Sequence, residues 1–377
     1  MSGRGPNLSG VSTIGWVRRQ AVGWSLPRDA GATLAAVVEG LGFVQADPIR
    51  APARAQDLIL RQRVRGYRAG DLDRRYPALD VDEDRLYAYG YVAGWVRRYL
   101  YPRYDRHTPG GRFVPAGRAA EVLAFVRENG VTHPRDVQGH LGHQPATNAW
   151  GGTSSATTLD LERLHRHGYL RVADRAAGVR RYEVAPPPDD PPDADERVRA
   201  LVLLVARILA PVPAASLSTA VSPLVLWVAG PRRRPGGLPV IRDLVARGEL
   251  AAADVDGVRY VWPADLVPVE DAAPARVRIL APFDPVVWDR RRFGQAWGWD
   301  YRFEAYTPVA KRVLGYYAMP LLWRDRVIGW ATCPGPGQEV RLGYVGSAPT
   351  GVTYRRALAA EIERLRTFLG PASVARE

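Results

Sequence analysis

A pattern that occurs twice, once on each side of a proline-rich segment, constrains the fold of this chain more than any other sequence feature. In both copies a leucine precedes a glycine by four positions, and a second leucine follows that glycine by two. A Gly-Val-Arg segment then leads to a tyrosine. The two copies comprise Leu164, Gly168, Leu170, Gly178 and Tyr182, and then Leu244, Gly248, Leu250, Gly257 and Tyr260. Each copy predicts a helix that ends at a glycine, a strand, a tight turn and a second strand.

A helix followed by a two-stranded hairpin is the winged-helix unit, which usually places its helices and hairpin on nucleic acid. A third, weaker version lies near the N-terminus, where the apolar run 34–38 leads into the glycine-containing run 40–44. Some winged-helix arrays only bind other proteins, so the repeat indicates binding and says nothing about catalysis. Periodicity predicts helices over residues 31–40, 117–129, 154–167, 195–210 and 353–369, and strands and turns over residues 277–344.

The charge balance indicates an anionic partner. Lys and Arg number 52 against 39 Asp and Glu in 377 residues, which gives a formal net charge of +13. An excess of this size favours binding to nucleic acid. No apolar run reaches the ~18 residues that a membrane-spanning helix needs, and residues 1–15 lack the apolar core of a signal peptide. We therefore expect a soluble, cytoplasmic protein.

Residue counts and spacing exclude several common catalytic sites. Cys333 is the only cysteine, which rules out an internal disulfide, a Cys-based zinc finger and an iron–sulfur cluster held by four thiolates. None of the six histidines is paired with carboxylates at the spacing of metal ligands. The chain also lacks a Gly-rich phosphate loop, a Gly-x-Ser-x-Gly turn and a His-Glu-x-x-His helix. We expect neither a metal nor a cofactor.

One short segment, residues 44–50, combines a carboxylate and an amide at a useful spacing. Pro48 favours an extended conformation for Asp47. In an extended segment residues i and i+2 share a face, so Gln45 and Asp47 are predicted to point the same way and to hold one water between them. The alternative is an ordinary Asp-Pro turn after a helix.

The same segment opens a longer resemblance. Residues 42–49 and the motifs that follow them resemble the YcaQ/AlkZ superfamily of interstrand-crosslink-repair DNA glycosylases. The resemblance continues in order to about residue 345, and its strongest part is the run from Leu280 to Arg292. The other motifs that carry it are Arg54-Ala55, Arg63-Val64-Arg65-Gly66-Tyr67, Asp300-Tyr301-Arg302, Tyr306-Thr307-Pro308 and Lys311-Arg312-Val313-Leu314-Gly315-Tyr316-Tyr317.

This resemblance implies an α+β fold with three tandem winged-helix motifs and a C-terminal β-barrel-like domain, C-shaped around a concave basic face that binds DNA. The first winged helix is expected to hold the catalytic motif, and the last domain to end in a helix. The expected boundaries are 1–115, 116–185 and 193–266 for the winged helices, 186–192 for the proline-rich linker, and 275–377 for the barrel-like domain.

The resemblance also implies the chemistry. The catalytic motif of the superfamily is Gln-x-Gln in one branch and Gln-x-Asp in the other, and Gln45-Ala46-Asp47 matches the second, YcaQ-type branch. This branch implies hydrolysis of the N-glycosidic bond of N7-alkylguanine, including crosslinked guanine. Asp47 would stabilise an oxocarbenium-like transition state and activate a water that Gln45 orients.

The scarcity of lysine bears on a second possible activity. Glycosylases that also cut the backbone use an amine to form a Schiff base. Only Lys311, the single lysine, or the α-amino group could serve here, and Lys311 lies in a basic motif better suited to phosphate. We expect a monofunctional enzyme that leaves an abasic site.

One segment departs from the pattern of the superfamily. Where a Trp-x-His core is common, this chain has Tyr89 and Tyr91. Tyr89 could stack on an extruded base, whereas the loss of the imidazole at Tyr91 leaves the lesion preference open. Alternatively, the two tyrosines belong to an ordinary packed aromatic stripe.

DNA binding is expected to be mainly electrostatic. Arginine forks suit phosphate oxygens, and basic residues cluster after the catalytic motif and in the C-terminal signature. The expected DNA-binding residues are Arg50, Arg54, Arg61, Arg63, Tyr89, Tyr91, Arg290, Arg291, Lys311 and Arg312. The expected partner is double-stranded DNA with alkylated or crosslinked guanine, bound by a monomer at the bacterial nucleoid.

Other functions are compatible with the same residues. The chain could be a non-catalytic winged-helix DNA-binding or regulatory protein, a narrow self-resistance glycosylase for one genotoxin, or an RNA-binding module. The intact Gln45 and Asp47 argue against the first of these.

Overall fold

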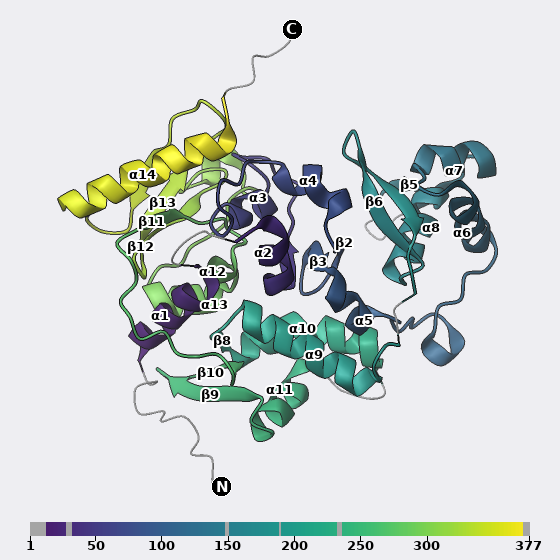
Figure 1. Ribbon diagram of the computed structural model, residues 1–377, viewed down its shortest axis with the longest axis horizontal. Helices are drawn as coiled ribbons and strands as arrows, with labels where there is room; N and C mark the ends of the chain where they lie inside the picture. Colours follow the sequence, from purple (N-terminus) through teal and green to yellow (C-terminus); the bar gives the residue numbers. More distant parts are fainter. Residues whose placement is uncertain (1–12, 28–31, 148–150, 188–189, 232–235, 372–377) are drawn as a thin grey trace.

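The structure of the chain, a computed structural model, describes residues 13–27, 32–147, 151–187, 190–231 and 236–371 (Figure 1). It is an α+β fold in which helices pack against several small antiparallel sheets. Within the described residues, no helix combines the length and the apolar character that crossing a membrane requires.

The repeat predicts local structure correctly in both copies. Each copy forms a helix and then an antiparallel hairpin, and the glycine after the helix has a positive φ of 78° at Gly168 and 73° at Gly248. The repeated leucines and tyrosines are at most 4% exposed. The leucines and Tyr182 belong to the core of their own unit, whereas Tyr260 packs in a cluster with Trp16 of α1 (Ile14–Ser25). The elements are α8 (Ala156–Arg166), β6 (Leu170–Ala176) and β7 (Val179–Val184), then α11 (Gly237–Ala246), β9 (Leu250–Val255) and β10 (Val258–Pro263).

Two further helices precede each copy. In Figure 1 the helices of the first copy lie together at one side of the molecule, and those of the second lie below its centre. The elements that complete the first copy are α6 (Arg118–Asn129), α7 (Pro134–Leu141), β4 (Pro145–Thr147) and β5 (Thr153–Ser155). Those that complete the second are α9 (Ala194–Ile208), β8 (Val212–Pro213) and α10 (Ala214–Ala229). Periodicity did not reveal α10, because this helix is apolar on most sides and contains Pro223.

The third, weaker copy of the repeat, near the N-terminus, agrees with the other two only in part. The helix α2 (Leu34–Leu41) ends at Gly42, with a φ of 70°, and leads directly into β1 (Phe43–Gln45). However, β1 pairs with β3 (Tyr89–Ala93), which comes much later in the chain, and β3 pairs with β2 (Val81–Arg85). The remaining helices of this region are α1 (Ile14–Ser25), α3 (Ala55–Leu60), α4 (Asp71–Arg75), η1 (Tyr76–Ala78), η2 (Gly94–Val96), α5 (Arg97–Leu100) and η3 (Pro109–Gly111).

The C-terminal segment contains a four-stranded antiparallel sheet with the strand order β11-β12-β13-β14. The long helix α14 (Val352–Leu369) packs across it, as Figure 1 shows. The strands are β11 (Val277–Ile279), β12 (Met319–Trp323), β13 (Arg326–Thr332) and β14 (Arg341–Tyr344), and the short helix η4 (Val309–Lys311) lies between the first two.

The expectation of only strands and turns over residues 277–344 is wrong. This segment also forms the helices α12 (Pro285–Trp288) and α13 (Arg290–Trp297). The side chains of Asp284 and Asp289 each accept hydrogen bonds from backbone N–H groups at the start of these helices. Such N-caps start short helices that hydrophobic periodicity alone does not reveal.

Candidate active site

A cavity of 360 Å³ opens where β1 ends, between the N-terminal elements and the β6–β7 hairpin. Its lining combines Asp47 and Gln56 with two tyrosines and four arginines; the polar residues are Asp47, Gln56, Tyr89, Tyr91, Arg50, Arg54, Arg175 and Arg180. An adjoining cavity of 280 Å³ shares Arg50, Arg54, Tyr91 and Arg175 with it. Two larger cavities, of 520 and 510 Å³, contain no residue of the segment 44–50 that the sequence analysis selected, so we place the candidate site in the cavity that contains Asp47.

The backbone around Asp47 is held from two sides. The Ile49 N–H donates to Asp47 Oδ1 at 2.9 Å, and the Asp47 N–H donates to Gln56 Oε1 at 3.4 Å. Burial raises the pKa of the Asp47 carboxyl, and the hydrogen bond from Ile49 only partly offsets this effect. The turn expected as the alternative is therefore present, and it also holds a carboxylate of raised basicity in the cavity wall.

Gln45 occupies a different position from Asp47. It lies opposite Gly90 on β3, where a Cβ would stand 2.3 Å from the carbonyl oxygen of Val44, so this strand contact requires glycine. The Gln45 Oε1 atom is buried and accepts no hydrogen bond from the described residues. Because β1 ends at Gln45, strand alternation does not extend to Asp47. Gln56, which sequence reasoning missed, lines the cavity beside Asp47.

Tyr89 and Tyr91, which stand where the superfamily commonly has a Trp-x-His core, are fixed by hydrogen bonds to carboxylates. Tyr91 is 3% exposed, packs edge-on against Tyr76, and donates to Asp73 at 3.0 Å. Tyr89 donates to Glu83, and the Arg180 guanidinium lies over its ring at 4.8 Å. For Tyr91 this is the expected alternative of a packed aromatic stripe; its ring is too buried to stack on a base.

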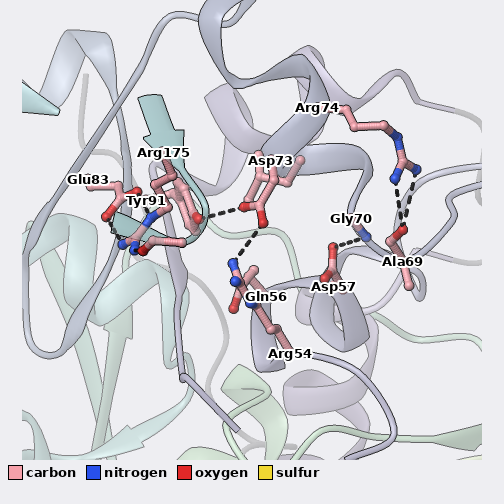
Figure 2. Close-up of polar contacts among 12 residues, drawn as sticks. Arg54, Gln56, Asp57, Ala69, Gly70, Asp73, Arg74, Glu83, Tyr91 and Arg175 are labelled. Atoms are coloured by element: carbon pink, nitrogen blue, oxygen red, sulfur yellow. Dashed lines mark hydrogen bonds and ion pairs between the residues drawn. The ribbon is translucent and has the colours of Figure 1, made fainter. Parts of the chain in front are cut away.

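Arg54 and Arg175 converge on the cavity from opposite sides, each held by one carboxylate (Figure 2). Arg54, in the segment before α3, donates to Asp73 at 2.7 Å. Arg175, on β6, makes two bonds to Glu83 at 2.7 and 2.5 Å. Burial alone would raise the pKa of Glu83, but hydrogen bonds and charge from Arg175 outweigh it and lower that pKa. Glu83 therefore remains ionised and holds the arginine in place.

Three of the arginines expected to bind DNA make ion pairs or hydrogen bonds within the protein. The Arg63 side chain is 2% exposed and pairs with Asp284, which is fully buried. Arg61 is 4% exposed in its pair with Glu361 of α14. Arg290 donates to the carbonyl oxygens of Val287 and Pro282. Arg61 and Arg63 join segments far apart in the chain, whereas Arg290 bonds to carbonyl oxygens three and eight positions before it. Reaching a phosphate would break these contacts.

The other predicted basic residues remain accessible. Arg50 lines the cavity, and Arg291 and Lys311 are exposed. Arg312 is half-buried and donates to the Thr307 carbonyl oxygen at 2.8 Å. Lys311, at the end of η4, and Arg312 belong to the segment 306–313, and Tyr306 at its start is 77% exposed.

Tyr306 lies close to Asp47. Burial first, and the negative charge of Asp47 second, raise the pKa of Tyr306 and of its buried neighbour Tyr317. Sequence reasoning did not select either tyrosine, although both stand in the motifs that carry the resemblance. Within the described residues, no group of three or more His, Cys, Asp or Glu side chains could hold a metal ion.

Comparison with known proteins identifies the family. The family model described as "AlkZ-like: DNA glycosylase AlkZ-like" matches residues 38–368, which include every residue that lines the cavity. The chain belongs to the AlkZ-like DNA glycosylase family. Among solved structures, this AlkZ-like chain is similar to the Streptomyces sahachiroi DNA glycosylase AlkZ, with a TM-score of 0.60 and 13% sequence identity. The match covers 96% of this chain and 97% of the other, so the fold is shared throughout.

Proposed function

We propose that this AlkZ-like chain hydrolyses the N-glycosidic bond of N7-alkylated guanine in duplex DNA and also unhooks crosslinked guanine. The observation that carries the proposal is the position of Asp47. This carboxylate has a raised pKa and lies in a cavity with Arg50, Arg54, Arg175 and Arg180. The arginines suit binding of the DNA polyanion. The carboxylate suits a reaction in which positive charge develops at a sugar carbon.

The reaction needs only one carboxylate. N7 alkylation makes guanine cationic, so the base leaves as a neutral molecule when the bond between sugar C1′ and N9 breaks, and no general acid is required. The oxocarbenium-like sugar is stabilised by Asp47. Water adds to C1′, its proton passes to Asp47, and the products are the free base and an abasic site. Lys311 is the only lysine, which supports hydrolysis without Schiff-base cleavage of the strand.

We also propose the finer architecture. Three helices followed by a hairpin, over residues 118–184 and again over 194–263, support two winged helices, and the α2–β1 segment with β2 and β3 supports a third. The four-stranded sheet with α14 would be the barrel-like domain. Gln45-Ala46-Asp47 supports the YcaQ-type Gln-x-Asp branch.

The experiment that tests the proposed function is single-turnover release of base from a duplex with one N7-methylguanine. Release is measured directly as free base and as alkali-labile strand, and an untreated sample tests for strand cleavage by the protein. We expect alkali-labile sites with no untreated cleavage. Binding of the duplex without release from this substrate, or from a crosslinked one, would contradict the proposal and favour a non-catalytic DNA-binding protein.

Two amides compete for the role of orienting the water, and one pair of variants separates them. We expect Gln45→Ala to slow base release about tenfold, which corresponds to one lost hydrogen bond of ~1.4 kcal/mol. Gln56→Ala should slow it less, because Gln56 acts through the backbone N–H of Asp47. Gln338→Ala, at an exposed position, is the control. If Gln56→Ala proves the slower variant, Gln56 orients the water instead.

The pH dependence should report the Asp47 carboxylate. Because burial raises its pKa, single-turnover release is expected to fall with decreasing pH at values above the ordinary aspartate pKa of about 3.9. The rate is measured across the acidic range, with uncatalysed release subtracted at each pH. A rate that stays constant down to pH ~4 would show that Asp47 does not titrate in this reaction.

A further inference from the structure

The β6–β7 hairpin brings two arginines to the cavity wall that sequence reasoning did not select. Arg175 lies near the end of β6 and Arg180 near the start of β7, on either side of the turn at Ala177 and Gly178. Both line the cavity that contains Asp47. Their side chains are 26% and 27% exposed, so both are partly accessible where they line the cavity.

One carboxylate fixes both arginines. Glu83, on β2, is 3% exposed and accepts from Arg175 at 2.7 and 2.5 Å and from the Arg180 Nε at 3.4 Å. Figure 2 shows Arg175 at Glu83 beside Tyr91. The geometry joins the hairpin to the strand pair that carries the two tyrosines, and it aims both guanidinium groups before any ligand arrives.

Arg175 has binding capacity left after these contacts, whereas Arg180 also hydrogen-bonds to Tyr182. A guanidinium has five N–H donors. Arg175 uses two on Glu83 and one, at 2.9 Å, on the Gly178 carbonyl oxygen, which leaves two. Two positive charges also face one negative charge at Glu83. A surplus of forked donors and positive charge on a cavity wall matches an oxyanion with several acceptor oxygens.

We infer that Arg175 and Arg180 bind a phosphodiester of the damaged strand, next to the nucleotide whose sugar reaches Asp47, with Glu83 as the residue that positions them. This inference rests on the proposed function, since it assigns the cavity to a nucleotide. The β6–β7 hairpin thereby completes the site that contains Asp47, which follows β1 in the N-terminal region. Arg54, held by Asp73 across the same cavity, would meet the strand from the opposite side.

A purely structural role for these ion pairs is the competing explanation, and the chain offers a matched control. Arg171 is also on β6 and pairs with Asp82 of β2 at 3.5 Å, one residue before Glu83. It joins the same two strands but does not line the cavity. Loss of Arg171 therefore weakens the junction without removing a donor from the site.

The test is the salt dependence of binding to a duplex with one tetrahydrofuran abasic-site analogue. Each phosphate contact contributes about 0.9 to the slope of log Kd against log salt concentration. We expect Arg175→Ala and Arg180→Ala each to lower the slope, and the double variant to lower it by about 0.9, the contribution of the one phosphate that both contact; Arg171→Ala should leave it unchanged. Arg175→Lys keeps the charge and should restore the slope with weaker binding than wild type, because lysine lacks the fork. Thermal melting of each variant shows that it is folded.

Two results would overturn the inference. One is a wild-type slope in both Arg175→Ala and Arg180→Ala; the other is an equal loss of slope in Arg171→Ala, which would assign the effect to the junction. Failure of the proposed function is separable. Base release from N7-methylguanine with unchanged slopes contradicts only this inference, whereas arginine-dependent slopes without any base release contradict only the proposed function.

Discussion

Replacement of Asp47 by asparagine is expected to slow single-turnover release of N7-methylguanine by about 10²- to 10⁴-fold, the range for loss of a positioned general base. Asparagine keeps the size of the side chain, and its carbonyl oxygen can still accept the hydrogen bond from the Ile49 N–H. The substitution removes the charge that stabilises the sugar cation and the basic group that accepts the proton from water. The measurement compares wild type, Asp47→Asn and the exposed control Asp300→Asn on one duplex.

The same variant should not lose stability, and this separates catalysis from folding. Burial raises the pKa of Asp47 in the folded protein. For an acid, a raised pKa means that the folded state binds the proton more tightly than the unfolded state. The ionised carboxylate therefore lowers stability once the pH exceeds the pKa of Asp47 in both states. At pH 7 the melting temperature of Asp47→Asn should equal or exceed that of wild type. A rate within tenfold of wild type would contradict the catalytic role, and a large fall in melting temperature would contradict the predicted effect on stability.

The largest expected loss of stability follows from Asp284→Ala. Asp284 is fully buried and receives two bonds from Arg63, at 2.7 and 3.1 Å. Arg63 also donates to Ser25 and to the Ile59 carbonyl oxygen, so the pair joins the N-terminal segments to the C-terminal domain. Removal of one partner leaves a buried, uncompensated charge, and we expect a loss of about 3–5 kcal/mol in the free energy of unfolding.

Denaturant unfolding measures this effect, and two variants control it. Asp300→Ala removes an exposed pair with Arg302 and should leave the stability unchanged within error. The double variant Arg63→Met/Asp284→Leu removes both charges and should lose less stability than Asp284→Ala alone. An equal or smaller effect of Asp284→Ala than of Asp300→Ala would contradict the structural role of the pair.

This buried pair changes the interpretation of the C-terminal signature. Asp284 and Asp289 cap α12 and α13, and Arg292 is 1% exposed and donates only to backbone carbonyl oxygens. A row of charged residues in a basic protein indicates DNA contacts on sequence grounds, yet here most of the row holds the domain together. Sequence cannot separate a DNA contact from a buried structural contact, because the local sequence around the arginine is the same in both cases.

Local spacing was enough to predict the repeated helix and hairpin and the glycines that end the helices, whereas the predicted common face of Gln45 and Asp47 depends on a strand that ends at Gln45. Each of these depends on residues a few positions apart, and their periodicity is set by backbone geometry. The sequence analysis missed α10 because this helix is apolar on most sides. It missed α12 and α13 because they are short and are marked only by an N-cap, without hydrophobic periodicity.

What the tertiary structure decided is which distant side chains meet. Arg175 reaches Glu83 across 92 positions, and Arg63 reaches Asp284 across 221. Both are arginine–carboxylate pairs, but the first borders a cavity and keeps free donors, whereas the second is sealed in a core. This difference is set by burial and by contacts between segments far apart in the chain. Neither can be predicted from residue type and local spacing.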